Sequence, residues 1–251
     1  MITRDERGAR AAATRVDFAG AGLWVWNGDE SNARELARLL ARHGFQYLAI
    51  KAHDGTTTYR RNRNEIARYV DAAHAHGLAF GLWGYLTARD AAGEARLAAD
   101  LVREHRASFY FANAEAEYER ATQRVSRGFA RTFRDELPTL PAALSSFGRI
   151  DLHPNLDWRA WRDHGFEFDP QAYEADSRLL TPARCVEAAR GVWPMTMIRP
   201  TLGAYKGALS RPSPTRLAQS LNEVRTKGFN VWRNGTVTAA DLAALADHAR
   251  G

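Results

Sequence analysis

Carboxylate and amide side chains stand where several apolar runs of the sequence end. Asn113, Glu115 and Glu117 follow one such run, and Asp169 and Gln171 close another. Two carboxyl groups on neighbouring strand ends suit glycoside hydrolysis, because one protonates the leaving oxygen while the other acts as nucleophile or base. We therefore expect Glu115 and Asp169 to be the pair of catalytic carboxylates.

Aromatic and polar residues at the same strand ends are candidates for binding a sugar chain. Aromatic faces stack on sugar rings, and a few polar groups fix the orientation of a bound ligand. The candidates are Trp24, Trp26, Asn27, Lys51, Asp54, Trp83, Tyr85, Asn113, Glu117, Gln171, Tyr173, Arg199 and Trp232.

Each of these residues also has a structural interpretation that the sequence leaves open. The carboxylates can form ion pairs with Lys51 or Arg199, and one of Trp24 and Trp26 can fill the core. For His53 we expect a hydrogen-bonded loop residue rather than a catalyst.

The elements that must position these residues are apolar runs alternating with amphipathic segments. This pattern predicts parallel strands joined by crossover helices. Eight such units in about 230 residues fit a single α/β (β/α)8 TIM barrel, in which the ligand site lies at the carboxyl ends of the strands. An open doubly wound sheet is the alternative, although no Gly-x-Gly-x-x-Gly follows the first strand, as a Rossmann sheet would require. The predicted strands are Leu23–Trp26, Tyr47–Lys51, Ala79–Tyr85, Phe109–Ala114, Ala142–Phe147, Phe166–Asp169, Met195–Arg199 and Asn230–Trp232.

Strand parity predicts which side chains enter the barrel. Residues two apart share a side of a strand. If Leu23 and Val25 face the helices, Trp24 and Trp26 point inward. The inward set on later strands is Asn113, Glu115, Glu167, Asp169 and Gln171.

Helix starts are marked by capping residues. Asn32 and Asn62 each stand three residues before a glutamate, which is typical of a capping box. Thr181 and Ser213 each precede a proline, which is favoured at the first helical position. Thr238 has an aspartate three residues later and resembles the same device.

Composition excludes several classes of protein. The 251 residues are 45% hydrophobic, which excludes disorder as the main state. No apolar run reaches the roughly 20 residues of a membrane helix, and the first twenty residues contain no apolar signal region. We therefore expect no membrane span and synthesis in the cytoplasm without a signal peptide. Because Cys185 is the lone cysteine, we expect no intrachain disulfide and no zinc site built on cysteines. No strand end gathers three Asp, Glu or His residues at convincing spacing, so we expect no metal and no cofactor.

The chain carries a net charge of +6 with a pI near 9.8. Many arginines fall at helical spacing, as in Arg34, Arg38 and Arg42, which is typical of solvated helix faces. This argues against nucleic acid as the partner. The basic loop Tyr59–Arg63 follows the second strand and is a candidate for contact with an anionic glycan, with solvated charge as the simpler interpretation. We divide the chain into an N-terminal arm, residues 1–20, and a barrel, residues 21–251.

The first half of the chain resembles the family 25 glycoside hydrolases, lysozyme-type muramidases that cut peptidoglycan. The run Phe45–Gly55 is similar to that family's second strand, which ends in Lys-Ala-Thr-Glu-Gly, and Gly81–Tyr85 resembles its third strand. Asn113–Glu115 falls where the family has Asp-x-Glu. The resemblance implies a TIM barrel, Glu115 as general acid and a cell-wall polysaccharide as partner. It also implies a phage lysin or tail-associated module, virion-associated or released at lysis.

Two acidic positions of that family differ here. Trp24 stands at the first-strand aspartate and Asn113 at the first carboxylate of Asp-x-Glu, so Asp29, Glu117 or Asp169 would have to substitute in an active enzyme. The alternative is a barrel that binds glycan without cutting it, such as a phage tail module whose N-terminal arm contacts the virion or a second copy. A third hypothesis, a phosphate-handling barrel enzyme, would need a phosphate-binding glycine turn after the seventh or eighth strand.

Overall fold

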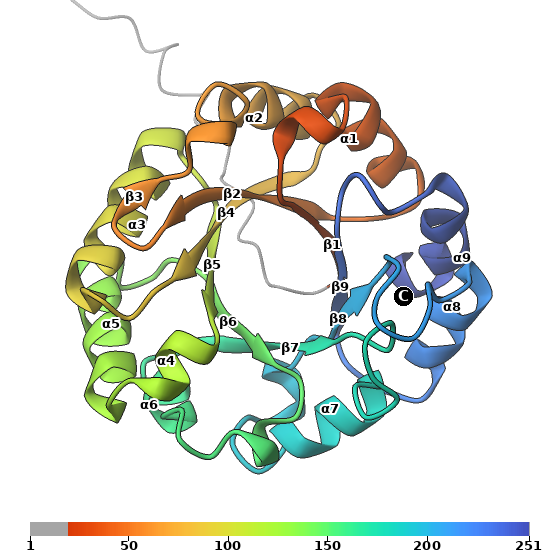
Figure 1. Cartoon of the computed structure of the whole chain (residues 1–251). Helices are drawn as coiled ribbons and strands as arrows, with labels where there is room; N and C mark the ends of the chain where they lie inside the picture. Colours follow the sequence, from red (N-terminus) through yellow and green to blue (C-terminus); the bar gives the residue numbers. More distant parts are fainter. Residues whose placement is uncertain (1–19, 251) are drawn as a thin grey trace, which may run out of the picture.

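Eight parallel strands close into a ring in the computed structural model of the protein, which describes residues 20–250 (Figure 1). The strand β1 pairs with both β2 and β9, which closes the ring. The short β3 (Thr57–Thr58) pairs antiparallel with β2 outside it. The predicted TIM barrel is confirmed. In ring order the strands are β1 (Gly20–Val25), β9 (Gly228–Trp232), β8 (Thr201–Gly203), β7 (Glu167–Ala172), β6 (Ala142–Phe147), β5 (Phe109–Ala114), β4 (Ala79–Leu86) and β2 (Tyr47–Asp54).

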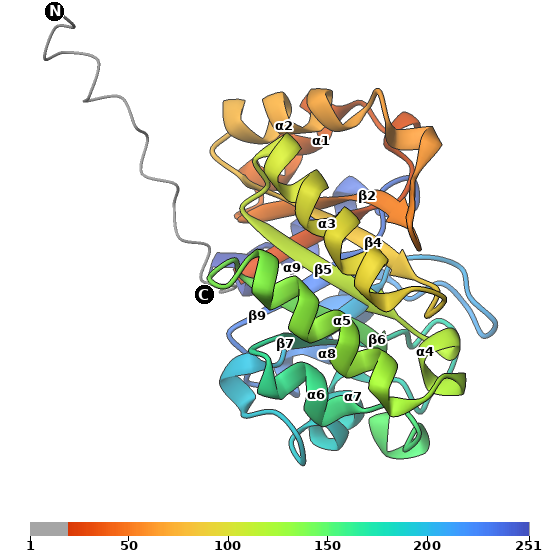
Figure 2. The same ribbon diagram turned by 90° about the vertical axis from the view of Figure 1, so that its left-hand side faces the viewer.

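Helices surround the ring and cover the outer faces of the strands (Figures 1 and 2). In the side view, α3 and α5 lie next to each other along the barrel wall (Figure 2). Among residues 20–250, every helix is too short or too polar to span a bilayer. The predicted N-terminal arm lies outside the described residues, apart from Gly20, which begins β1. The helices are α1 (Ala33–Arg42), α2 (Ile66–Ala75), α3 (Ala91–His105), α4 (Ala116–Arg120), α5 (Gln123–Glu136), α6 (Trp158–Asp163), α7 (Pro182–Ala189), α8 (Pro214–Asn222) and α9 (Ala239–Arg250).

The predicted seventh strand, Met195–Arg199, is wrong. Met195–Met197 forms a 3-10 helix, and the strand at this place in the ring is β8. Ile198 forms one isolated bridge to Phe168, but Pro200 has no N–H to continue the ladder. Regular pairing therefore begins only after the proline.

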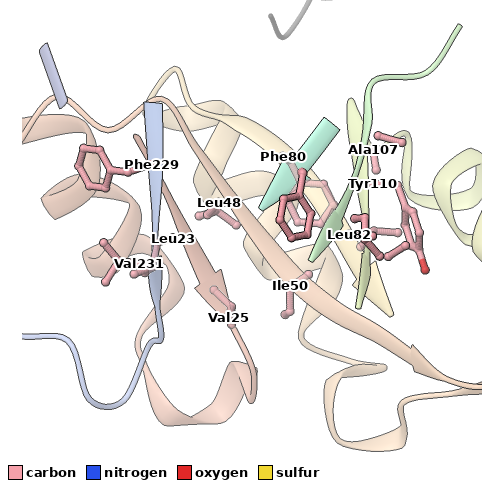
Figure 3. Packing of buried hydrophobic residues seen from close by; sticks show 14 of the residues in the cluster. Leu23, Val25, Leu48, Ile50, Phe80, Leu82, Ala107, Tyr110, Phe229 and Val231 are labelled. Carbon is pink, nitrogen blue, oxygen red and sulfur yellow. The ribbon is translucent and has the colours of Figure 1, made fainter. Parts of the chain in front are cut away.

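Two separate apolar regions fill the barrel wall and its interior. The outer region lies between strands and helices and contains Leu23, Val25, Leu48 and Ile50 (Figure 3). The inner region is aromatic and lies inside the ring. This division follows strand parity, because alternate residues of each strand face opposite sides. The inner region comprises Trp24, Tyr47, Ala49, Trp83, Phe109, Phe111 and Ala143.

Most of the expected helix caps are present. The Asn32, Thr181 and Ser213 side chains each accept a hydrogen bond from a backbone N–H three residues on. Thr238 and Asp241 cap each other reciprocally, through Thr238 N to Asp241 Oδ2 at 2.7 Å and Asp241 N to Thr238 Oγ1 at 3.2 Å. These bonds satisfy donors that the helices leave free.

His53 is buried on the outer face of the barrel wall rather than at a reactive position. Its Nδ1 donates to the carbonyl oxygen of Gly55 at 2.8 Å, and the Tyr110 hydroxyl donates to Nε2 at 2.8 Å. The imidazole ring of His53 packs directly against Gly84, where a Cβ atom would lie 1.9 Å from Nε2. Burial lowers the pKa of His53 to about 4. These contacts agree with the expected hydrogen-bonded role of His53, but the residue lies within β2 and not in a loop.

The lowered pKa of His53 predicts acid sensitivity. The unfolded chain binds a proton on this residue below about pH 6.5, but the folded protein does so only near pH 4. The free energy of unfolding therefore decreases as the pH is lowered through that interval. At pH 4.5 it should be about 2 kcal/mol smaller than at pH 7. Urea unfolding of wild type and His53→Gln at the two pH values measures it. The variant, less stable at pH 7, should show a pH-dependent loss about 2 kcal/mol smaller; an equal loss in both proteins would contradict the assignment.

Candidate functional site

Glu115 stands at the mouth of the barrel, directly after β5. The Gln171 side chain, on β7, donates through Nε2 to Glu115 Oε1 at 2.8 Å and to Asn113 Oδ1 at 3.1 Å. Glu115 and Gln171 are half-buried, whereas Asn113 is buried. The structure therefore brings together three of the residues that the sequence placed at the site, from two different strands.

Three tyrosines lie within electrostatic reach of the Glu115 carboxylate. Burial raises the pKa of Tyr85, Tyr173 and Tyr205, and the negative charge of Glu115 adds to each shift. These phenols are therefore protonated at neutral pH and keep their hydroxyls as donors. The Tyr85 hydroxyl donates to Glu117 Oε2 at 2.7 Å. Tyr205 was not among the predicted site residues, because the strand before it, β8, begins later than the predicted strand Met195–Arg199.

A buried carboxylate outside the ring fixes the segment that follows Glu115. The Tyr118 hydroxyl, in α4, donates to Glu94 Oε2 at 2.8 Å. Glu94 Oε1 accepts from Thr87 N at 2.9 Å and from Thr87 Oγ1 at 2.7 Å. Glu94 thus joins the segment after β4 to the segment after β5. Its role was not visible in the sequence, because a single glutamate on a helix reads as surface charge.

Two buried asparagines hold the segment that carries Trp26. Asn234 Oδ1 accepts from Trp26 N at 2.8 Å, and Asn234 Nδ2 donates to the Asn27 carbonyl at 2.7 Å. Asn62 Oδ1 accepts from Gly28 N at 2.8 Å, and its Nδ2 donates to the Trp26 carbonyl at 2.7 Å. The expected capping role of Asn62 is therefore wrong, because its side chain is used by a distant backbone segment.

Trp26 presents an indole at the mouth on this fixed backbone. Its side chain is 37% exposed, with the Arg233 guanidinium 4.6 Å from the ring centroid. The Tyr59 hydroxyl donates to Asn27 Oδ1 at 2.8 Å. In the same loop Arg61 pairs with Asp29, which neutralises part of its basic charge.

Trp24 and Trp83 fill the interior instead. Trp24 stacks on Phe111 with centroids 4.9 Å apart and contacts Trp83 at 5.2 Å. Trp232 bridges this interior to the mouth, because it lies 5.9 Å from both Trp24 and Trp26. Core filling, one of the two interpretations considered for the tryptophan pair, therefore applies to Trp24.

Lys51 is enclosed by aromatic rings and paired with an acid. Its Nζ lies 2.6 Å from Asp54 Oδ1. The ring centroids of Tyr59, Trp83 and Tyr85 lie 4.3, 5.2 and 5.8 Å from Nζ. Asp54 is thus explained by the ion pair with Lys51, and the cation–π contacts further stabilise the position of the Lys51 ammonium group.

Asp169 lies in a buried ionic cluster inside the barrel. Its side chain is 0% exposed; Oδ1 accepts from Arg199 Nη2 at 2.5 Å and Oδ2 from Asn230 Nδ2 at 2.9 Å. Arg199 also bonds to Glu167. Burial raises the pKa of Asp169 to about 7, against the opposing charge of Arg199. Both carboxylate oxygens are thus engaged, as a structural ion pair requires.

A series of rings separates this cluster from the indole at the mouth. Contacts run from Trp26 through Trp232 and Trp24 to Phe111, which lies 6.2 Å from Tyr47. The Tyr47 hydroxyl in turn donates to Asn230, a partner of Asp169. Within residues 20–250, no three His, Cys, Asp or Glu side chains gather as metal ligands.

Comparison with known proteins shows the fold and no family. Neither protein-family models nor curated proteins match the sequence. Among solved structures, a class V chitinase from Pseudomonas fluorescens Pf-5 matches with TM-score 0.71 and 11% identity, covering 90% of this chain and 98% of that one. The spore cortex-lytic enzyme SleL of Bacillus megaterium QM B1551 matches with TM-score 0.70 and 9% identity, covering 92% of this chain and 74% of that one. A chitinase-like agglutinin from Robinia pseudoacacia matches with TM-score 0.67 and 11% identity, covering 92% of this chain and 99% of that one.

The two tryptophans of β1 and the segment after it should respond differently to truncation. Trp24→Ala leaves a cavity in the interior, so we expect a loss of about 3–5 kcal/mol in the free energy of unfolding. Trp26→Ala should cost less than about 1 kcal/mol, because its ring is exposed. Denaturant unfolding of both variants measures the difference. Equal destabilisation by the two variants would contradict the assignment.

Removing the Asp169 charge should destabilise the fold. Asp169→Asn leaves Arg199 with a weaker set of partners in the interior, and we expect a loss of about 3 kcal/mol at pH 8.5, above the raised pKa of Asp169. Asp163→Asn, which removes a surface partner of Arg162, is the matched control and should cost less than about 1 kcal/mol. Guanidinium unfolding compares them. An Asp169→Asn protein as stable as wild type would show that the ion pair does not hold the barrel together.

Proposed function

We propose that this protein acts on a polysaccharide bound across the barrel mouth, as a glycoside hydrolase with Glu115 as the acid. The observation that carries the proposal is the position of Glu115 at the carboxyl end of β5, held by Gln171 among protonated tyrosines. Ligand sites of TIM barrels lie at this end. The exposed indole of Trp26 supplies a stacking surface at the same mouth.

The chemistry at the mouth favours a substrate that supplies its own nucleophile. Two-carboxylate hydrolysis needs both groups beside the bond that breaks. Asp169, the predicted second carboxylate, is buried and engaged by Arg199 and Asn230, so its structural role competes with a catalytic one. Substrate-assisted hydrolysis is an exception to this scheme, because the substrate itself supplies the nucleophile. Glu115 would give its proton to the glycosidic oxygen as the bond from that oxygen to the anomeric carbon breaks, while the 2-acetamido oxygen of the sugar bonds to the same carbon. Water would then open this cyclic intermediate, adding its hydroxyl to the anomeric carbon and returning its proton to the Glu115 carboxylate.

The proposed substrate is therefore a glycan of 2-acetamido sugars. Peptidoglycan, which the resemblance to family 25 implies, contains such sugars. The fold shared with chitinases and a spore cortex-lytic enzyme supports action on this class of polymer. Release at host lysis, or incorporation in a phage tail, stays a prediction about where the protein would meet the cell wall.

A second candidate function is glycan binding without cleavage. Asn113 provides an amide where the resembling family has a carboxylate, and Asp169 is held in the ionic cluster. The fold is also that of a chitinase-like agglutinin. In this alternative the mouth residues bind sugar, and Glu115 acts only as a hydrogen-bond acceptor.

Cleavage of purified cell walls distinguishes the two functions. Wild type should release new reducing ends, and Glu115→Gln should lower the rate about 10²–10⁴-fold while still sedimenting with the walls, because only the proton donor is lost. Glu136→Gln, which removes a surface partner of Arg103 on the outer helices, is the matched control and should keep the wild-type rate. Binding without release by wild type would establish the alternative. Neither binding nor release would refute both.

A further inference from the structure

A pocket of about 200 Å³ opens beside the mouth, between the segments that follow β6 and β7. Two of its lining residues, Gln171 and Tyr173, also belong to the surroundings of Glu115. The pocket is therefore continuous with the proposed glycan site. Its other lining residues are Phe147, Gly148, Arg149, Leu152, His153, Ser177, Leu179 and Leu180.

The lining combines aromatic rings with exposed leucines. Leu152 is 56% exposed and Leu179 is 48% exposed, which is unusual for large apolar side chains that share one pocket. In the described part of the chain, the exposed large apolar residues also include Trp26 and Leu209, and both lie on segments that follow strands. Exposed apolar surface thus gathers on the face that carries the proposed site.

The two basic side chains of the lining are already occupied. Arg149 donates to both carboxylate oxygens of Asp151, at 2.8 and 2.6 Å. His153 Nδ1 lies 3.1 Å from the Glu119 carboxylate, and its ring stacks on Phe147 at 3.7 Å. An apolar group placed here would need no hydrogen-bond partner.

Gly148 defines the wall of the pocket. A Cβ atom at this position would lie 2.5 Å from the Gln171 carbonyl oxygen and 2.6 Å from Cys185 Sγ. Only glycine lets the segment after β6 approach β7 this closely. The pocket is thus set by backbone packing rather than by movable side chains alone.

We propose that this pocket binds an apolar substituent carried by the glycan, such as an aryl or short acyl group. A cavity of about 150 Å³ lined by apolar side chains is large enough for benzene, so this pocket has room for one or two fused rings. The inference rests on the proposed function, because it places the sugar chain at Glu115 and its substituent beside Tyr173. The substrate class is therefore a glycoconjugate with an apolar substituent rather than an unsubstituted polysaccharide.

Binding of matched ligands tests the pocket. The probes are the tetrasaccharide of N-acetylglucosamine, its 4-methylumbelliferyl glycoside and 4-methylumbelliferone alone, measured by calorimetry or fluorescence in the Glu115→Gln background to prevent cleavage. The aryl group should tighten the dissociation constant of the tetrasaccharide at least about tenfold. The double variant Leu152→Ser/Leu179→Ser should reduce the affinity gained from the aryl group to less than about threefold. Its affinity for the free tetrasaccharide should be unchanged. Leu209→Ser, equally exposed but outside this pocket, should keep the full gain.

The outcomes separate this inference from the proposed function. An aryl glycoside that binds no tighter than the free sugar, or an equal loss in Leu209→Ser, would overturn the pocket while leaving the glycan site intact. If no sugar binds, the proposed function fails. In that case the apolar pocket is still supported if 4-methylumbelliferone binds to the Glu115→Gln protein but not to its Leu152→Ser/Leu179→Ser variant. If 4-methylumbelliferone does not bind to the Glu115→Gln protein, the pocket is overturned as well.

Discussion

Filling the interior of the ring is the constraint on which the rest of this barrel depends. Eight strands point alternate side chains inward, and the space they enclose must be packed without voids. Trp24, Trp83 and Phe111 fill its middle in direct ring contact. Because these rings occupy the centre, polar groups are divided between a mouth that contains Glu115 and an enclosed ionic cluster that contains Asp169.

The mouth depends on a second set of contacts, made by buried polar side chains outside the lumen. Asn62 and Asn234 bond to the backbone around Trp26, and Glu94 joins the segments after β4 and β5. The connecting segments contain backbone N–H and C=O groups that are not paired by the hydrogen bonds of strands or helices. A few amides and carboxylates from distant parts of the chain meet that need, and they thereby hold the side chains of the site on a fixed frame.

The strand pattern was predictable because it depends on local sequence. Period-two alternation placed Trp24, Asp169 and Gln171 on the inner face correctly. Contacts between distant segments were not predictable in the same way. The burial of Asp169 depends on Arg199, thirty residues later, and the role of Asn62 depends on a segment more than thirty residues earlier. An amide with a nearby glutamate looks like a cap until its distant partner is known, and an apolar run next to Pro200 looks like a strand.

The closure of the ring joins segments far apart in the chain. The strand β1 pairs with β2 on one side, but its other edge meets β9, more than two hundred residues later. During synthesis on a ribosome, that edge is without its partner until Gly228–Trp232 emerges from the exit tunnel. An unpaired edge is a template for association with other chains. The β1 edge of a nascent barrel of this topology is thus open to association with other chains until the last unit has been made.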